Sequence, residues 1–167
     1  AITVSLLKRP AEHQPARGTV FVNPGGPGAS GKDLATSIET TAFADHDVIG
    51  WDPRGAGSST PVQCGSDEDM DAYLSVDTSP DSPDEDEALR AAAQKFADRC
   101  VEESGRLLQH ISTVDTVADL DLLRHLVGEE KLDFLGFSYG TEIGAVYAAT
   151  HPDRVGHMVL DSPVSLE

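Results

Sequence analysis

Two apolar segments that lead directly into loops rich in glycine and proline constrain the fold of this chain more than any other feature. Residues 19–22 precede the loop 23–31, which reads NPGGPGASG, and residues 47–51 precede the loop 52–59, which reads DPRGAGSS. Glycine and proline at this density end a helix or a strand. The sequence therefore predicts two strands, each followed by a shaped loop at its carboxyl end.

Helical and extended patterns alternate in the second half of the chain. Apolar residues recur at three- and four-residue spacing between Thr113, the predicted N-cap, and Gly128, which is predicted to close the helix. A compact apolar strand is predicted over 132–137, a helix with small residues over 141–150, and a further strand from 158 to 160. This alternation is typical of an α/β fold with a mostly parallel sheet.

The region of about 61–111 is predicted to form an acidic excursion on the surface. It begins with a stretch that contains several prolines, for which a solvated loop is predicted, and it ends with a helix over 87–103. Asp67, Asp69 and Asp71 match the first ligands of a calcium-binding loop, but the glycine and the bidentate glutamate that such a loop requires are both missing. Calcium binding is therefore a minor alternative. The sequence shows no internal repeat, and no linker is predicted to divide the chain into two domains.

The composition excludes several classes of protein. The 167 residues include 12 Lys and Arg against 29 Asp and Glu, which gives a formal net charge of −17. Such a chain repels nucleic acid and anionic membrane surfaces, so neither is expected as a partner. No segment approaches the roughly 18 apolar residues of a membrane-spanning helix, and residues 1–10 lack the order of a signal peptide. The chain is predicted to be soluble.

The two cysteines, Cys64 and Cys100, are far apart in the sequence and belong to no C-x-x-C motif. The six histidines show no H-x-x-x-H spacing either, so no metal site is predicted. Two interpretations of the cysteines remain open at this point. They form a disulfide if the protein folds in an oxidising compartment, or they are two thiols in a reducing one.

Residues 136–140 read GFSYG and match the G-x-S-x-G motif between a predicted strand and a predicted helix, which is the context that the motif requires. In this strained turn the two glycines avoid collisions, and the hydroxyl of Ser138 projects above the sheet. The amino end of the following helix favours negative charge that develops there. Ser138 is therefore predicted to be a nucleophile for acyl transfer, which needs no cofactor. The alternative is a serine in a tight turn without a chemical role.

A serine nucleophile needs two backbone N–H groups that point at the substrate carbonyl oxygen as it becomes an oxyanion. The amide of Tyr139, next to the serine, is predicted to be one donor. Consecutive glycines in the loop 23–31 allow the backbone to approach a substrate, and Gly26 is predicted to be the other donor. The alternative for this loop is a turn that only ends the strand.

The segments 23–31, 52–59 and 136–141 together resemble the α/β-hydrolase fold. Within that fold the chain is similar to the proline-iminopeptidase-like serine peptidases, and most of all to the secreted tripeptidyl aminopeptidases of actinobacteria. The similarity runs from Thr3 to Pro163. One departure is Pro24, where the wider family often has histidine, and this departure is typical of the tripeptidyl branch.

The resemblance implies a role for each matching residue. Ser138 is expected to be the nucleophile, with Gly26 and Tyr139 lining the oxyanion hole. The residues expected to support the neighbouring loop are Asp52, Arg54 and Gly57. The resemblance also implies that Cys64 and Cys100 form a disulfide and that the protein is exported.

A histidine base for Ser138 is not apparent in this sequence. His151 lies at the far end of the predicted helix and His157 at the opposite edge of the sheet, so neither is predicted to reach the serine. His110 lies on the catalytic face but precedes the serine, which is the wrong order for this fold. Asp161 ends a strand on the catalytic side, and the resemblance implies a structural role for it.

The resemblance implies that the family continues beyond Glu167 with a lid and the last strands, which carry the catalytic acid and histidine. Residues 1–167 are therefore expected to be the N-terminal part of an α/β-hydrolase catalytic domain, inactive alone and completed by a C-terminal polypeptide. The expected function is a serine exopeptidase that releases short N-terminal peptides from a peptide substrate. The alternatives are an esterase or lipase-like hydrolase of the same fold and a catalytically silent binding module.

Overall fold

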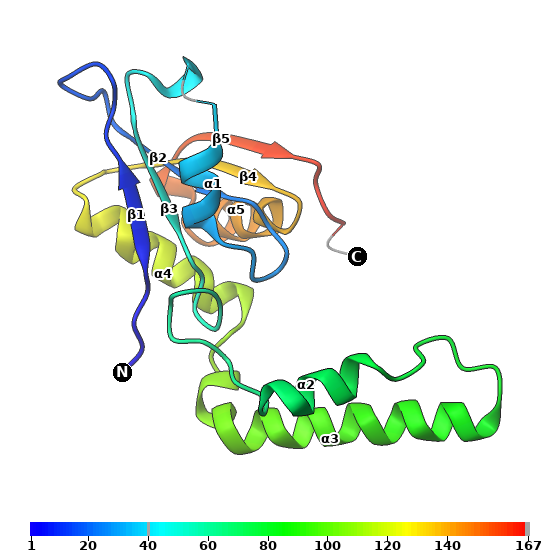
Figure 1. The fold of residues 1–167 in the computed structure, drawn as a ribbon. Helices are drawn as coiled ribbons and strands as arrows, with labels where there is room; N and C mark the ends of the chain where they lie inside the picture. The colour runs from blue at the N-terminus through cyan, green and yellow to red at the C-terminus, as the bar shows by residue number, and fades with distance from the viewer. Residues whose placement is uncertain (40, 166–167) are drawn as a thin grey trace. The chain divides into compact units, whose positions relative to one another are not determined.

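The computed structural model describes residues 1–39 and 41–165, and the chain divides into two compact units. The larger unit consists of residues 1–61 and 111–167, and the smaller unit consists of residues 62–110. Figure 1 shows a sheet flanked by helices in the larger unit and a helical hairpin in the smaller one. None of the helices in the described residues is long and apolar enough to cross a membrane.

The larger unit is built on a five-stranded sheet with the order β1-β3-β2-β4-β5. The strands are β1 (Leu6–Arg9), β2 (Thr19–Asn23), β3 (Asp47–Trp51), β4 (Leu132–Phe137) and β5 (Val155–Asp161). β1 is antiparallel to β3, and all other neighbouring strands are parallel. The predicted α/β fold with a mostly parallel sheet is confirmed.

Helices cover both faces of this sheet. They are α1 (Gly31–Ser37), α4 (Thr113–Leu126) and α5 (Tyr139–Thr150), and the short turns η1 (Thr41–Phe43) and η2 (Pro152–Arg154) precede β3 and β5 in the chain. α4 and α5 pack on one face, against a core that includes Phe21, Trp51 and Phe134, whereas α1 packs on the other face against Val22 and Val48. Burial of side chains of this size stabilises a fold by about 1.5–3 kcal/mol each, so the two cores hold the sheet and its loops in place.

The boundaries of α4 and α5 differ slightly from the prediction. Ser112, and not Thr113, is the N-cap of α4, because the Ser112 side chain accepts the Asp115 N–H. Gly128 follows the helix with a φ of 86°, so the predicted end is confirmed. α5 begins at Tyr139, two residues earlier than predicted, directly after the turn at Ser138.

The smaller unit is a hairpin of two helices, α2 (Asp67–Leu74) and α3 (Pro83–Leu108). A disulfide between Cys64 and Cys100 joins the start of the unit to α3, and this pairing confirms what the family resemblance implied. Next to it, the Gln63 N–H donates to the Ser104 hydroxyl oxygen at 2.8 Å, and that hydroxyl donates to the Gln63 carbonyl at 3.0 Å.

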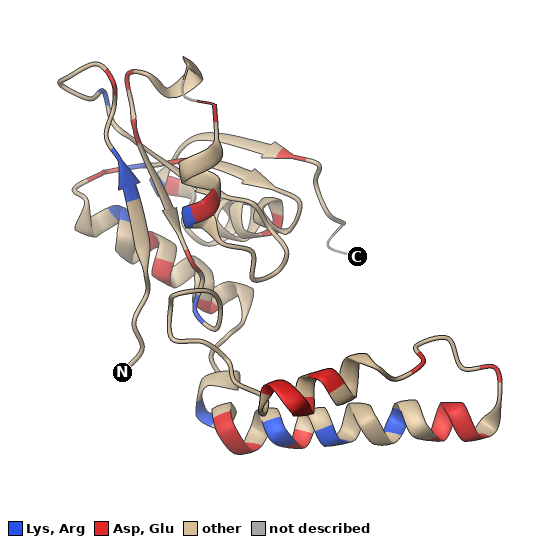
Figure 2. Ribbon diagram, in the orientation of Figure 1, with Lys and Arg blue, Asp and Glu red and all other residues tan. Residues whose placement is uncertain are grey.

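The solvated loop predicted around Asp67 is wrong, because these residues form α2. Ser66 and Asp69 form a capping box at its amino end, and Ser82 and Glu85 form another at the start of α3. Acidic side chains are stabilised at helix amino ends by the helix dipole. Figure 2 shows them along α2 and at the start of α3. The aspartates of the calcium-like pattern therefore belong to a helix and not to a calcium-binding loop.

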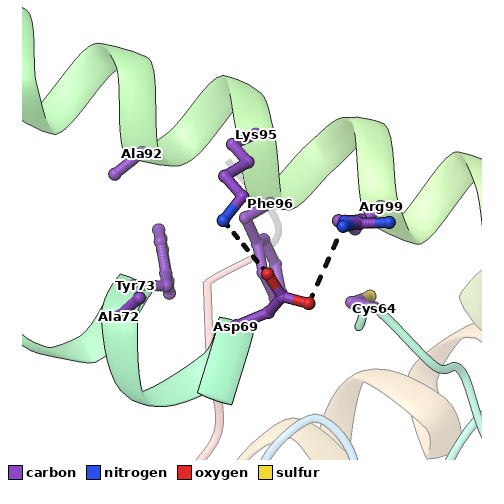
Figure 3. A pocket seen from close by; sticks show the side chains of 8 residues that line it. All are labelled: Cys64, Asp69, Ala72, Tyr73, Ala92, Lys95, Phe96 and Arg99. Atoms are coloured by element: carbon purple, nitrogen blue, oxygen red, sulfur yellow. Dashed lines mark ion pairs between the residues drawn. The ribbon is translucent and has the colours of Figure 1, made fainter. Parts of the chain in front are cut away.

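A small cavity of about 60 Å³ lies between α2 and α3 (Figure 3). Tyr73 and Phe96 stack beside it with their ring centroids 4.6 Å apart. Asp69 forms ion pairs with Lys95 at 3.0 Å and with Arg99 at 4.0 Å. Because the space suffices for only a few water molecules and its two cations face Asp69, these contacts serve the packing of the hairpin.

Candidate active site

Ser138 occupies a sharp turn between β4 and α5, and we call residues 136–140 the serine turn. Ser138 has φ 51° and ψ −124°, a conformation that residues with a Cβ atom rarely adopt. Its N–H donates to the Asp161 carbonyl at 3.0 Å, and its carbonyl accepts from the N–H and the hydroxyl of Thr141 at 2.9 and 2.6 Å. The Asp161 carboxylate accepts from Ser162. The Ser138 hydroxyl caps no N–H of α5, so helix capping does not occupy it.

Two glycines make the serine turn sterically possible. A Cβ atom on Gly136 would lie 2.5 Å from the Gly140 carbonyl oxygen, and one on Gly140 would lie 2.7 Å from the Asn23 carbonyl oxygen. Both distances are shorter than any ordinary contact between carbon and oxygen. Gly136 is therefore required by the close approach of β4 and the start of α5, and Gly140 by the close approach of β2 and α5.

The loop after β2 packs directly on the serine turn. Gly25 has φ 97°, and a Cβ atom there would lie 2.6 Å from the Phe137 carbonyl oxygen and 2.8 Å from the Tyr139 nitrogen. The side chain of Asn23 holds this glycine, because its Oδ1 accepts the Gly25 N–H at 2.9 Å. Asn23 is fully buried, and its Nδ2 has no hydrogen-bond partner in the described part of the chain.

The N–H groups of Gly26 and Tyr139 are available in this arrangement. The Gly25 N–H is occupied by Asn23 and is therefore excluded as an oxyanion donor. Within residues 1–39 and 41–165, neither the Gly26 N–H nor the Tyr139 N–H donates to another backbone carbonyl. Tyr139 is the first residue of α5, where a helix leaves its N–H groups without internal partners. These are the two donors predicted from the sequence, and their role stays a prediction.

Asp52 connects the loop after β2 to the loop after β3. It is only 2% exposed, and its carboxylate accepts the Ser30 hydroxyl at 2.7 Å and the Ser58 N–H at 2.8 Å. Burial raises the pKa of Asp52, but these hydrogen bonds and the charge of Lys32 outweigh burial and hold the pKa below its ordinary value. Gly57 lies against the same carboxylate, where a Cβ atom would approach Oδ2 to 2.5 Å.

Arg54 extends from the same loop to α4. Its guanidinium donates to both carboxylate oxygens of Asp119, at 2.7 and 2.6 Å, and to Asp115 at 3.3 Å. A bidentate pair of this kind fixes orientation as well as distance. Arg54 therefore holds the loop 52–59 on α4, and the hydrogen bond from Ser30 to Asp52 holds it on the loop after β2. Gly57 packs against Asp52 within the loop 52–59 itself.

The histidines that follow Ser138 bond elsewhere. His151 lies at the end of α5 and contacts the Thr150 hydroxyl at 2.9 Å. His157 contacts Asp133, near the start of β4, at 3.1 Å, whereas Ser138 follows the end of that strand. His110 belongs to the smaller unit. The hydrogen bonds described for His151 and His157 therefore join them to Thr150 and Asp133, and not to the Ser138 hydroxyl.

Sequence patterns did not indicate three side chains that bond around the serine turn: Asn23, Thr113 and Glu142. Thr113 Oγ1 lies 2.7 Å from the Tyr139 hydroxyl oxygen and 2.9 Å from Glu142 Oε1. These partners are 26 and 29 residues away from Thr113 in the sequence, so no local spacing could have revealed them. For Thr113 the sequence showed a hydroxyl residue at the start of a predicted helix, and such a residue is interpreted first as a helix cap.

A family model for the α/β-hydrolase fold matches residues 18–167. The chain therefore belongs to the α/β-hydrolase fold family. It is 39% identical over 155 residues to the tripeptidyl aminopeptidase of Streptomyces lividans, an alignment that covers 89% of this chain and 29% of that protein. It is 40% identical over 154 residues to the serine protease Hip1 of Mycobacterium tuberculosis, an alignment that covers 88% of this chain and 29% of that protein.

The chain thus spans less than a third of the length of these two relatives. Among solved structures, the proline iminopeptidase of Mycobacterium smegmatis matches with a TM-score of 0.54 and 21% identity, over 91% of this chain and 38% of that one. This match supports the fold. The resemblance to actinobacterial tripeptidyl aminopeptidases, inferred from the sequence, is confirmed, and the chain covers only part of a complete α/β-hydrolase domain.

Proposed function

We propose that this chain carries the nucleophile of a serine exopeptidase, which releases short peptides from the amino ends of polypeptides through an acyl-enzyme on Ser138. The observation that carries the proposal is the backbone of Ser138, held at φ 51° with Gly25 and the Tyr139 amide packed beside it. Such strain persists only where the surrounding structure enforces it, and it clusters at active sites. The similarity to a tripeptidyl aminopeptidase supports the choice of substrate.

The proposed reaction has two halves. Ser138 Oγ attacks the carbonyl carbon of the scissile peptide bond while a histidine takes its proton, and the resulting oxyanion accepts hydrogen bonds from the Gly26 and Tyr139 N–H groups. When the tetrahedral intermediate collapses, the C–N bond breaks, the histidine protonates the leaving amine, and the acyl group stays on Ser138. Water then attacks this ester, which releases the short peptide and restores the serine.

We propose that the histidine and its acid come from the remainder of the full-length protein. In this fold both follow the serine along the chain, and the relatives are more than three times as long as the aligned segment.

The same remainder of the full-length protein is proposed to cover the sheet face at β5. A cavity of about 470 Å³ opens there, lined by residues that include Val20, Leu135 and Val159, and Val159 is 58% exposed.

We further propose that the protein works outside the cytoplasm. The Cys64–Cys100 disulfide supports this location, because structural disulfides persist in oxidising compartments. The location is tested by expressing the full-length protein in its native host and comparing the cytoplasmic and exported fractions. Recovery of the protein only as a reduced cytoplasmic species would contradict it.

The activity is tested on the full-length protein with three classes of substrate and one covalent inhibitor, an active-serine phosphonate. The substrates are tripeptidyl amides with a free amine, their N-acylated counterparts, and short acyl esters. We expect the free tripeptidyl amides to turn over fastest, and an active-serine phosphonate to label Ser138 alone in a peptide map. Faster turnover of the esters would favour the esterase alternative. Absence of both labelling and turnover would favour a silent binding module.

A further inference from the structure

Thr113 is the first residue of α4, and its side chain takes no part in capping that helix, because Ser112 does so. The Thr113 Oγ1 instead contacts the Tyr139 hydroxyl at 2.7 Å and Glu142 Oε1 at 2.9 Å. Thr113, Tyr139 and Glu142 are all half-buried. We call these three side chains the Thr113 row, which crosses from the start of α4 to the first turn of α5.

The Thr113 row has a defined hydrogen-bond direction. A carboxylate only accepts hydrogen bonds, and a threonine hydroxyl has a single proton to donate. Thr113 therefore donates to Glu142, and the Tyr139 hydroxyl must in turn donate to Thr113. In this direction the tyrosine hydroxyl is committed to one acceptor, which restricts rotation of its ring.

We propose that Thr113 and Glu142 are positioning residues for acyl transfer, which hold Tyr139 and through it the predicted oxyanion donor; this inference rests on the proposed function. Tyr139 is the residue whose N–H is predicted to bind the oxyanion, and its ring packs against the core of α4 and α5. The Tyr139 ring is thus held at two points, by the hydrogen bond at its hydroxyl and by packing along its side. Because the ring is attached to the first residue of α5, this restricts movement of the backbone at the start of that helix.

The start of α4 is itself anchored, which makes the Thr113 row a rigid support. Arg54 binds Asp119 and Asp115 on the first two turns of α4, so the loop after β3 and the Thr113 row share one helix. A misplacement of about 1 Å near reacting atoms costs on the order of 100-fold in rate. A support that holds the oxyanion donor to within about 1 Å is therefore expected to lower the energy of the transition state more than it strengthens substrate binding.

The experiment compares variants of the full-length protein at the Thr113 row. Thr113→Val removes the hydroxyl at almost constant volume, Thr113→Ser keeps it, and Tyr139→Phe removes the donor at the other end. Thr150→Val is the matched control, because the Thr150 hydroxyl bonds to the Val146 carbonyl within the same helix, far from the serine turn. For each variant, kcat and KM on a tripeptidyl amide and the midpoint of thermal unfolding are measured.

We expect Thr113→Val and Tyr139→Phe to lower kcat by about tenfold each with KM changed by less than about twofold, as for loss of an interaction that acts in the transition state. The double variant is expected to lose no more than Thr113→Val alone, since Thr113→Val already removes the hydrogen bond that Tyr139→Phe removes, together with the bond to Glu142. Thr113→Ser and Thr150→Val are expected to retain kcat.

Three results would overturn the positioning role: full kcat in Thr113→Val, equal losses in Thr113→Val and Thr113→Ser, or additive losses in the double variant. Ser138→Ala separates this inference from the proposed function. If Ser138→Ala is inactive and Thr113→Val is normal, only the positioning role fails. If Ser138→Ala is active, the proposed function fails.

Discussion

Gly25 lies so close to Tyr139 that a Cβ atom on Gly25 would come within 2.8 Å of the Tyr139 nitrogen. This contact joins the loop after β2 to the first residue of α5. It also places the residue before Gly26 against the residue that carries the other predicted oxyanion donor. The relative position of the two donors is therefore set by direct backbone packing, and a change at Gly25 is expected to disturb both.

We expect Gly25→Ala in the full-length protein to lower kcat strongly, because the added methyl group must push the loop away from the serine turn. Gly128→Ala is the matched control. Gly128 also has a positive φ, of 86°, but a Cβ atom there meets no atom within 4 Å. The control should lose about 1 kcal/mol of stability from backbone strain and keep its activity. Equal activity losses in the two variants would show that the contact with Tyr139 is unimportant.

We expect Ser138→Ala to lower kcat by at least about 10⁴-fold, because the acyl-enzyme can no longer form. The midpoint of thermal unfolding should change little, since the hydroxyl caps no helix and alanine adds no clash. Ser162→Ala is the control, because Ser162 also follows a strand with a positive φ of 55°. Near-normal turnover by Ser138→Ala would remove Ser138 from the mechanism.

Asp52 makes the stability of the larger unit depend on pH. Its pKa is lower in the folded protein than in an unfolded chain, because Ser30, Ser58 and Lys32 favour the charged form despite burial. Its contribution is therefore complete above the ordinary pKa of an aspartate and is lost as the pH falls through the folded value.

The free energy of unfolding of the wild type, measured with denaturant, should accordingly fall between about pH 5 and pH 2. The free energy of unfolding of Asp52→Asn should fall less over that range. Ser30→Ala, which removes one of the bonds to Asp52, is expected to lie between them. Parallel profiles for wild type and Asp52→Asn would contradict the assignment.

We expect Cys64 and Cys100 to be joined in protein isolated without reductant, so a non-reducing peptide map should show one cross-linked pair and no alkylated thiol. The double variant Cys64→Ser, Cys100→Ser should lose about 4 kcal/mol in the smaller unit by the chain-entropy argument. Limited proteolysis should then cut faster within residues 62–110 than in the sheet. Two alkylatable thiols in unreduced exported material would show that the pair does not form in the cell.

Part of the candidate site could be predicted because its signals are local. The G-x-S-x-G spacing lies within one turn, so the strand before Ser138 and the helix after it were both recognisable, and the structure contains both. Helix α2 was missed because its residues are acidic and its stability comes from the Ser66 capping box and from pairing of Asp69 with Lys95 on α3. An acidic stretch without an apolar stripe indicates a loop when its partner is not known.

The sequence by itself determined the class of fold, the position of the serine turn and the loops that meet it, because apolar periodicity and glycine placement act over a few residues. Only the tertiary structure decided which side chains hold that site: Asn23 on Gly25, Arg54 on Asp119, and Thr113 between Tyr139 and Glu142. The last two sets join different helices and loops. Their hydrogen bonds depend on how α4 and α5 pack against the sheet, and that packing is settled by the burial of the whole core.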